Sequence, residues 1–134
     1  MFLDLNSNLR KTIKDNLKIH DNKINIDSII FAGLVQTSLM CQDVLAKHLG
    51  TSDKWIDELL DTVAELIEIS KYILNSLKNV NDDELVCEYL KILGSTYLCS
   101  GTIVTVLGPR CLPHLSVSSS FYCLIYSLII IFRH

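Results

Sequence analysis

The sequence contains little of the residues that interrupt regular structure. Among its 134 residues are two prolines and five glycines, and aromatic residues make up only 7%. A β-sandwich would need more turn-forming residues, and a disordered chain would have fewer apolar residues than the 49% found here. This composition predicts an α-helical globular chain, and the length is enough for one domain with a modest core.

The sequence also lacks the pattern of an N-terminal signal peptide. The first residues, MFLDL, are followed at once by polar and charged residues, so no apolar signal core forms. The cysteines number five, and without a secretory signal we expect reduced thiols in an intracellular protein. Cys111 and His114 have a local spacing that suits zinc, but no second pair accompanies them, so we predict no metal site.

Motifs of catalytic chemistry are absent from the sequence. It has no phosphate-binding glycine loop, no Gly-x-Ser-x-Gly and no His-Glu-x-x-His, and its four histidines are scattered. Asp57, Asp61 and Glu65 share one face of a predicted helix, as carboxylates do in metal-binding bundles. Such bundles also need Glu-x-x-His on facing helices, which this sequence lacks. We therefore predict a protein that is not an enzyme, with no catalytic residue, no cofactor and no metal.

Charge is distributed unevenly along the chain. Residues 1–24 carry a net charge of +2, residues 25–107 a net charge of −7, and residues 108–134 a net charge of +2. The acidic middle segment would repel a phosphate backbone unless basic groups gathered in one patch. Direct RNA contact by this segment is therefore not expected, even in a ribonucleoprotein.

Four stretches have the apolar spacing of amphipathic helices: residues 3–19, 27–49, 52–77 and 82–107. Residues 108–115, with the sequence GPRCLPHL, then end the last helix. The turn between the second and third stretches is short, so these two helices are expected to pack antiparallel.

In the second stretch an apolar row recurs at steps of three and four and is expected to face the core. The row comprises Ile30, Leu34, Ser38, Cys41, Leu45 and Leu49. Asn25 or Asp27 is expected to cap the start of the helix, and Gly50 to adopt the left-handed conformation after its end. Asp43 and Lys47 are spaced for an ion pair on the outer side.

The third stretch divides into an apolar and an acidic face. Its expected inner face comprises Ile56, Leu59, Leu60, Val63, Leu66, Ile67, Ser70, Ile73, Leu74 and Leu77. The outer face carries Asp57, Asp61, Glu65 and Glu68 in one row. The simpler interpretation of this row is a solvated face, and the alternative is a docking strip for a basic segment of a partner protein.

The fourth stretch has an N-terminal capping signal, with Asn81 as the expected cap and Glu84 three residues later. Its expected inner face comprises Val86, Tyr89, Leu90, Leu93, Thr96, Tyr97, Ser100, Ile103, Val104 and Leu107. Small residues gather within it, at Gly94, Ser95, Ser100 and Gly101. Small side chains allow close approach of a neighbouring helix, although each glycine costs about 1 kcal/mol in helix propensity.

Three segments resemble the helices of HEAT repeats. Residues 34–50 read LVQTSLMCQDVLAKHLG and look like the first helix of a repeat, and residues 55–67 read WIDELLDTVAELI and look like its second. Residues 93–107 and 112–115, LGSTYLCSGTIVTVL and LPHL, look like the next first helix and the start of its partner. Over about residues 28–117 the succession is similar to the C-terminal half of the HEAT repeat-containing protein 1 family, which are very large nucleolar scaffolds of the small-subunit processome.

The resemblance implies an all-α fold made of antiparallel helical hairpins of an α-solenoid, as a HEAT-like repeat fragment. It also implies a location in the nucleus and nucleolus. The implied role is in ribosomal RNA transcription and pre-rRNA processing, through binding to other processome proteins, and no catalytic residue comes with it. Stacked neighbours are also favoured by the residues themselves, because the second helix has apolar side chains outside its main row.

We divide the chain into three parts: residues 1–24, an N-terminal helix and connector; residues 25–117, with one complete and one truncated HEAT-like repeat; and residues 118–134, an apolar tail. Within the tail, residues 121–132 contain a single polar residue, Ser127. Three interpretations of the tail stay open: a short membrane anchor, a segment that completes the core, or a non-native segment read through from noncoding DNA.

Two other functions remain as alternatives to the scaffold fragment. One is a small tail-anchored membrane protein, with its helical part on the cytoplasmic face and membrane contact only through residues 118–134. The other is a free-standing helical-bundle adaptor, which would unfold cooperatively as a monomer.

Overall fold

The computed structural model describes residues 2–114. The elements, in chain order, are α1 (Phe2–Leu17), α2 (Ile29–Leu49), η1 (Asp53–Trp55), α3 (Ile56–Leu77), α4 (Asp83–Leu107) and η2 (Gly108–His114). No β-strand is named in this part of the chain, so the all-α prediction is confirmed. Helices α2, α3 and α4 end at their predicted last residues, Leu49, Leu77 and Leu107. The tail predicted at residues 118–134 lies outside the described residues.

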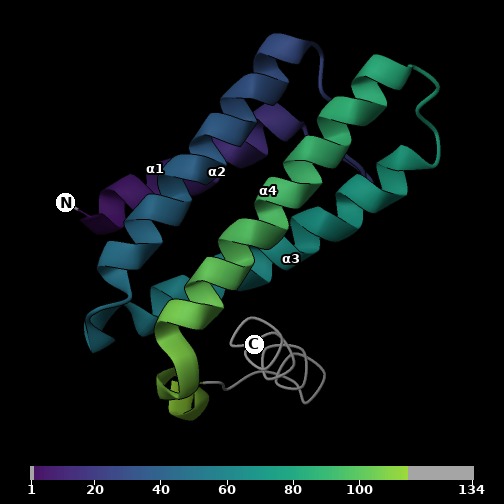
Figure 1. The fold of residues 1–134 in the computed structure, drawn as a ribbon. Coiled ribbons are helices and arrows are strands. Elements are labelled where there is room, and N and C mark those ends of the chain that lie inside the picture. Colours follow the sequence, from purple (N-terminus) through teal and green to yellow (C-terminus); the bar gives the residue numbers. More distant parts are fainter. Residues whose placement is uncertain (1, 115–134) are drawn as a thin grey trace.

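The four helices form two layers (Figure 1). Helices α2 and α4 lie side by side in one layer, and α1 and α3 form the other. Between the layers, α1 packs along α2, and α3 packs along α4. The prediction that α2 and α3 pack against each other across their short turn is wrong, because α2 packs mainly on α1 and α4, and α3 packs mainly on α4.

Helices within the α2–α4 layer run parallel. Near their starts, Gln36 Nε2 donates a hydrogen bond to Glu88 Oε2 at 3.1 Å. Near their ends, Gly50 approaches the side chain of Val106. The contacting residue numbers rise together along the two helices, which is possible only if both helices point the same way.

Helices α1 and α3 also run parallel. Asn6 near the start of α1 bonds to Thr62, and Lys14 near its end pairs with Glu65. Beyond α1, the backbone of Ile24 exchanges hydrogen bonds with the hydroxyl of Ser76. The antiparallel hairpins α1–α2 and α3–α4 are therefore stacked on each other in the same orientation.

The core lies between the two layers and draws on all four helices. Its largest fully buried side chains are Ile13, Leu17, Leu39, Leu49, Ile56, Leu59, Ile69, Ile73, Ile92, Ile103 and Leu107. Burying one such side chain stabilises the fold by about 1.5–3 kcal/mol. The predicted inner faces of α3 and α4 are confirmed for most of their length, but Leu74, Leu90 and Tyr97 are exposed.

The predicted inner row of α2 is confirmed at Ser38, Leu45 and Leu49 and is wrong at its other three positions. Ile30 is 81% exposed, and Leu34 and Cys41 are also exposed. The buried positions there include Val35 and Leu39, which lie outside the predicted row. The physical reason is that α2 is apolar on nearly all sides, so periodicity alone does not identify the side that packs against α1 and α4.

Gly50 serves a different purpose from the predicted one. Its backbone is right-handed, with φ −69° and ψ −11°, so the expected left-handed conformation is not found. A Cβ atom at this position would lie 1.9 Å from Val106 Cγ1, which means that glycine is needed for close approach of α4. The Arg110 guanidinium joins α2 and α4 at this same end of the α2–α4 layer. It donates to the backbone carbonyls of Gly50 and Val106, and at 2.8 Å to Asp53 Oδ1.

The observed helix caps differ from the predicted ones by one to three residues. Helix α2 is preceded by Ser28, whose side chain makes no capping hydrogen bond, rather than by Asn25 or Asp27. Helix α4 is capped by Asp82, whose carboxylate accepts from the amide of Glu84 at 3.0 Å. A charged oxygen at this position satisfies a free amide and complements the helix dipole, which explains why Asp82 takes the place expected for Asn81.

Candidate protein-binding groove

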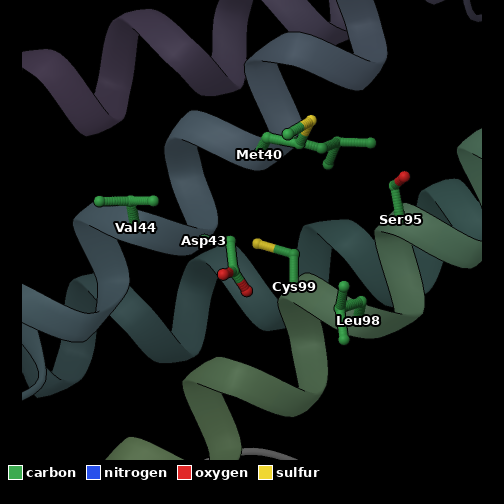
Figure 2. A pocket seen from close by; sticks show the side chains of 7 residues that line it. Met40, Asp43, Val44, Ser95, Leu98 and Cys99 are labelled. Carbon is green, nitrogen blue, oxygen red and sulfur yellow. The ribbon is translucent and has the colours of Figure 1, made fainter.

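A groove of about 220 Å³ runs along the outer side of the α2–α4 layer (Figure 2). Its lining residues are Leu39, Met40, Asp43, Val44, Ser95, Leu98 and Cys99. Three of the apolar side chains at its rim are largely in solvent: Met40 is 65% exposed, Val44 56% and Leu98 64%. The neighbouring parts of α2 expose Ile30 and Leu34 as well, so the groove belongs to a longer apolar face.

Asp43 is the polar group of this groove. Its Oδ2 atom lies 3.5 Å from Lys47 Nζ, which confirms the predicted i,i+4 pair. Its Oδ1 atom is buried and has no hydrogen-bond partner among the described residues. Leaving a buried oxygen without a donor costs about 1–3 kcal/mol, so a bound group that donates a hydrogen bond would be stabilised here.

Cys99 lies across the groove from Asp43 (Figure 2). Burial, with a smaller contribution from the Asp43 carboxylate, raises the pKa of the Cys99 thiol to about 12. The thiol is therefore protonated near neutral pH, and it points its sulfur at Gln42 Oε1, 4.0 Å away. A neutral, buried thiol is a poor nucleophile, so the arrangement suits packing and recognition better than chemistry.

A chain of buried polar side chains continues inward from Cys99 through all four helices. Gln42 Nε2 donates to Asn6 Oδ1 at 3.4 Å, and Asn6 Nδ2 donates to Thr62 Oγ1 at 3.1 Å and to Glu58 Oε1 at 2.7 Å. Asn6 and Gln42 are each only 1% exposed. Because buried amides are costly when unpaired, this network restricts how α1, α2, α3 and α4 can align.

Sequence reasoning assigned no role to Asn6. A usable signal was present, since Asn6 lies seven residues before the apolar Ile13 and so shares its side of the helix. A polar residue in an inner row often specifies the register of packing. The partners Thr62 and Glu58 were not predictable, because they are separated from Asn6 by more than 50 residues.

The four acids predicted as a docking strip have different environments. Glu65 is paired within the chain: its carboxylate lies 3.2 Å from Arg10 Nε and 3.0 Å from Lys14 Nζ. Asp57 Oδ1 lies 3.1 Å from His114 Nδ1. The basic segment that meets Glu65 is therefore α1 of the same chain.

The other two acids, Asp61 and Glu68, are exposed. A hydrogen bond from the Tyr72 hydroxyl to Glu68, with burial as a smaller cause, raises the pKa of Tyr72. A second, more polar cleft of about 520 Å³ lies beside Glu68, between Lys14 and Tyr72. Docking of a basic partner to these acids stays a prediction.

Two further observations concern metals and membranes. Among residues 2–114, no three histidine, cysteine, aspartate or glutamate side chains are grouped so that they could hold a metal ion.

In the same part of the chain, Ile29–Leu49 and Asp83–His114 are long and apolar enough to cross a membrane by length and composition alone. The fold buries 39% and 50% of these windows, and core helices of soluble proteins pass the same test, so this is weak evidence for a membrane.

Comparison with known proteins does not identify a relative. No protein-family model, no curated protein and no solved structure matches the chain. The likeness to HEAT repeats therefore rests on the three segments quoted from the sequence, and the arguments about function rest on the geometry of residues 2–114.

Proposed function

We propose that the chain is a non-catalytic scaffold fragment, built as an α-solenoid of HEAT-like hairpins, that acts by binding other proteins. The observation that carries this proposal is the parallel stacking of the α1–α2 hairpin on the α3–α4 hairpin. In an up-and-down four-helix bundle, adjacent helices alternate in direction. Stacked repeats instead place equivalent helices side by side and parallel, with each repeat contacting its neighbour.

The bonds between the two hairpins support a repeat for a second reason. Asn6 and Thr62 are 56 positions apart, and Gln42 and Cys99 are 57 positions apart, although the first pair joins α1 to α3 and the second joins α2 to α4. An almost constant offset in both layers is what an internal structural repeat produces. In this proposal α1–α2 and α3–α4 are the two repeat units, rather than α2–α3, which both the short turn and the HEAT-like segments suggested.

Binding to protein is supported by the groove on the α2–α4 layer. Its rim is apolar and exposed at Met40, Val44 and Leu98, while Asp43 Oδ1 is buried without a donor among the described residues. We propose that its partner is an amphipathic helix that carries apolar side chains and one hydrogen-bond donor for Asp43. Helix-in-groove recognition uses this combination of an apolar face with a single orienting polar contact.

The cellular setting of the proposal comes from the resemblance to the HEAT repeat-containing protein 1 family. On this resemblance we propose a nucleolar location, with other processome proteins as partners in ribosomal RNA transcription and pre-rRNA processing. The net charge of −7 on residues 25–107 favours contact with protein over direct contact with RNA.

The test is to express the tagged full chain in eukaryotic cells and to record both its location and its sedimentation with pre-ribosomal particles. We expect nucleolar signal and co-sedimentation, both lost with Leu98→Asp in the groove. The matched control is Leu5→Asp, which places the same charge at an exposed leucine of the other layer and should keep both. Signal on reticular or mitochondrial membranes would contradict the scaffold and support the tail-anchored alternative.

A further inference from the structure

The side of the α3–α4 hairpin that faces away from α1 and α2 carries two apolar rows. The row on α3 is Leu60, Ile67 and Leu74, and the row on α4 is Leu90, Tyr97 and Val104. Members of each row are seven residues apart, which is about two helical turns, so each row follows one side of its helix. We call these two rows together the free face.

The direction of the free face follows from the contacts of its neighbours. On α4, Tyr97 lies two residues before Cys99, which points at Gln42 of α2. On α3, Ile67 lies two residues after Glu65, which pairs with α1. Two residues correspond to a rotation of about 200° around a helix, so the free face lies on the side opposite the α1–α2 hairpin.

Exposure changes along the free face in a regular way. At one end, Leu60 is 7% exposed and Val104 is 1% exposed. Toward the other end, Leu74 is 45%, Tyr97 48% and Leu90 51% exposed. Because α3 and α4 are antiparallel, the buried members of both rows lie at the same end of the hairpin.

The element η2 lies at this covered end. It follows α4 directly, packs against α3 and α4, and buries Cys111 to 1% exposure. Its last residue, His114, is held 3.1 Å from Asp57 Oδ1 in the first turn of α3. The described part of the chain therefore ends beside the start of the α3 row. The exposed members of the free face lie farther along the same hairpin.

We propose that residues 121–132 of this same chain cover the exposed part of the free face and complete the packing that η2 begins. The segment has one polar residue in twelve, which matches an uncharged apolar surface. The six residues 115–120 span at most about 20 Å, and any twelve-residue segment can reach at least about 18 Å, the rise it would have as a helix. The uncovered interval from Ile67 to Leu74 is only about 10 Å along α3, so the segment is long enough.

Residues 121–132 are favoured over other occupants of the free face because they directly continue the chain from η2. A second copy of the chain or a membrane would have to approach a face that the preceding residues of the same chain already begin to cover. The groove between α2 and α4 is a less direct destination, because the segment would first have to cross α4. This inference does not depend on the scaffold function, since it concerns only how the hairpin is completed.

The test uses the full chain with a photo-crosslinking amino acid in place of Ile125, irradiated alone and with phosphatidylcholine vesicles. We expect crosslinks within one molecule, to peptides that contain Leu74, Leu90 or Tyr97. Crosslinks between two copies of the chain, or to lipid, would overturn the proposal. Mass spectrometry of the separated monomer and dimer bands distinguishes these outcomes.

Matched variants make the test specific. Tyr97→Asp and Leu74→Asp place a charge on the free face from two different helices and should each reduce the intramolecular crosslink several-fold. Leu98→Asp is the control, because Leu98 is the next residue along α4 but lines the α2–α4 groove. An equal yield in all three variants would overturn the proposal, provided that circular dichroism shows the helices intact. Loss of nucleolar signal without loss of the crosslink would contradict only the scaffold function.

Discussion

The α1–α3 layer and the α2–α4 layer hold parallel helices together by different means. In the first, Arg10 and Lys14 of α1 form ion pairs with Glu58 and Glu65 of α3. In the second, close approach at Gly50 and a single arginine, at position 110, join the ends of two helices that are mostly apolar. The comparison teaches that stacking of this kind does not require one particular contact chemistry.

The same difference separates the outer surfaces of the two layers. Both segments that are apolar enough to resemble membrane spans include a helix of the α2–α4 layer. That layer also exposes Met40, Val44 and Leu98 around the groove, whereas the ion pairs that join two helices of one layer are those of Arg10 and Lys14 in the α1–α3 layer. The α2–α4 layer therefore has the apolar surface that is better suited to binding a partner protein.

The largest effect is expected from the core that both layers share. Ile103 in α4 is fully buried, so Ile103→Ala leaves a cavity and should lower the free energy of unfolding by about 2–5 kcal/mol. Urea unfolding followed by circular dichroism measures the change. Ile30→Ala, at an exposed isoleucine of α2, is the matched control and should change stability by less than about 0.5 kcal/mol.

A smaller effect is expected where the α2–α4 layer closes tightly. In Gly50→Ala the new Cβ atom would meet Val106 Cγ1, and overpacking of this kind costs about 1–3 kcal/mol. The double variant Gly50→Ala with Val106→Ala should recover part of the loss in a double-mutant cycle. Strict additivity of the two changes would show that the helices do not approach each other at this point.

We expect stability to depend on pH because burial raises the pKa of the Cys99 thiol. Its pKa of about 12 is above the ordinary value of 9.0, so the folded state holds this proton more tightly than the unfolded state. The resulting stability is fully present below about pH 9 and is lost as the pH rises toward about 12.

At about pH 10 the loss should be on the order of 1 kcal/mol, and Cys99→Val should remove this part of the pH slope. Unfolding in urea at about pH 8 and about pH 10 provides the measurement. An unchanged slope in the variant would show that the thiol does not titrate as its burial implies.

The smallest effect is expected in the α1–α3 layer. Glu65→Gln removes the charge that pairs with Arg10 and Lys14, and partly exposed ion pairs contribute only about 0–1 kcal/mol. The loss should shrink further in high salt, because screening weakens the pairs in the unsubstituted protein. A cost as large as that of Ile103→Ala would show that these ion pairs contribute far more than partly exposed pairs ordinarily do.

How far the sequence predicts the fold differs from helix to helix. In α3 the apolar and acidic faces are cleanly separated, so Leu59, Val63 and Ile73 were assigned to the core correctly. In α2 nearly every side is apolar, and the assignment of Ile30 and Leu34 to the core was wrong. Periodicity identifies a buried face only where the other face is polar.

The candidate site was less predictable than the helices. The groove depends on α2 and α4 lying next to each other, and its Asp43 and Cys99 come from helices that are distant in sequence. The acidic row was recognised from its spacing, but the pairing of Glu65 with Arg10 depends on a partner 55 residues away. Local patterns contain no information about which distant helix will lie opposite.

The sequence by itself determined the helical class of this protein and where three of its helices end, because helix propensity, caps and breaks act over a few neighbouring residues. Only the tertiary structure decided that the two hairpins stack in parallel, that Asn6 is buried, and that Gly50 is needed for a close contact. Those features depend on the mutual burial of side chains more than 50 residues apart, which no local pattern specifies.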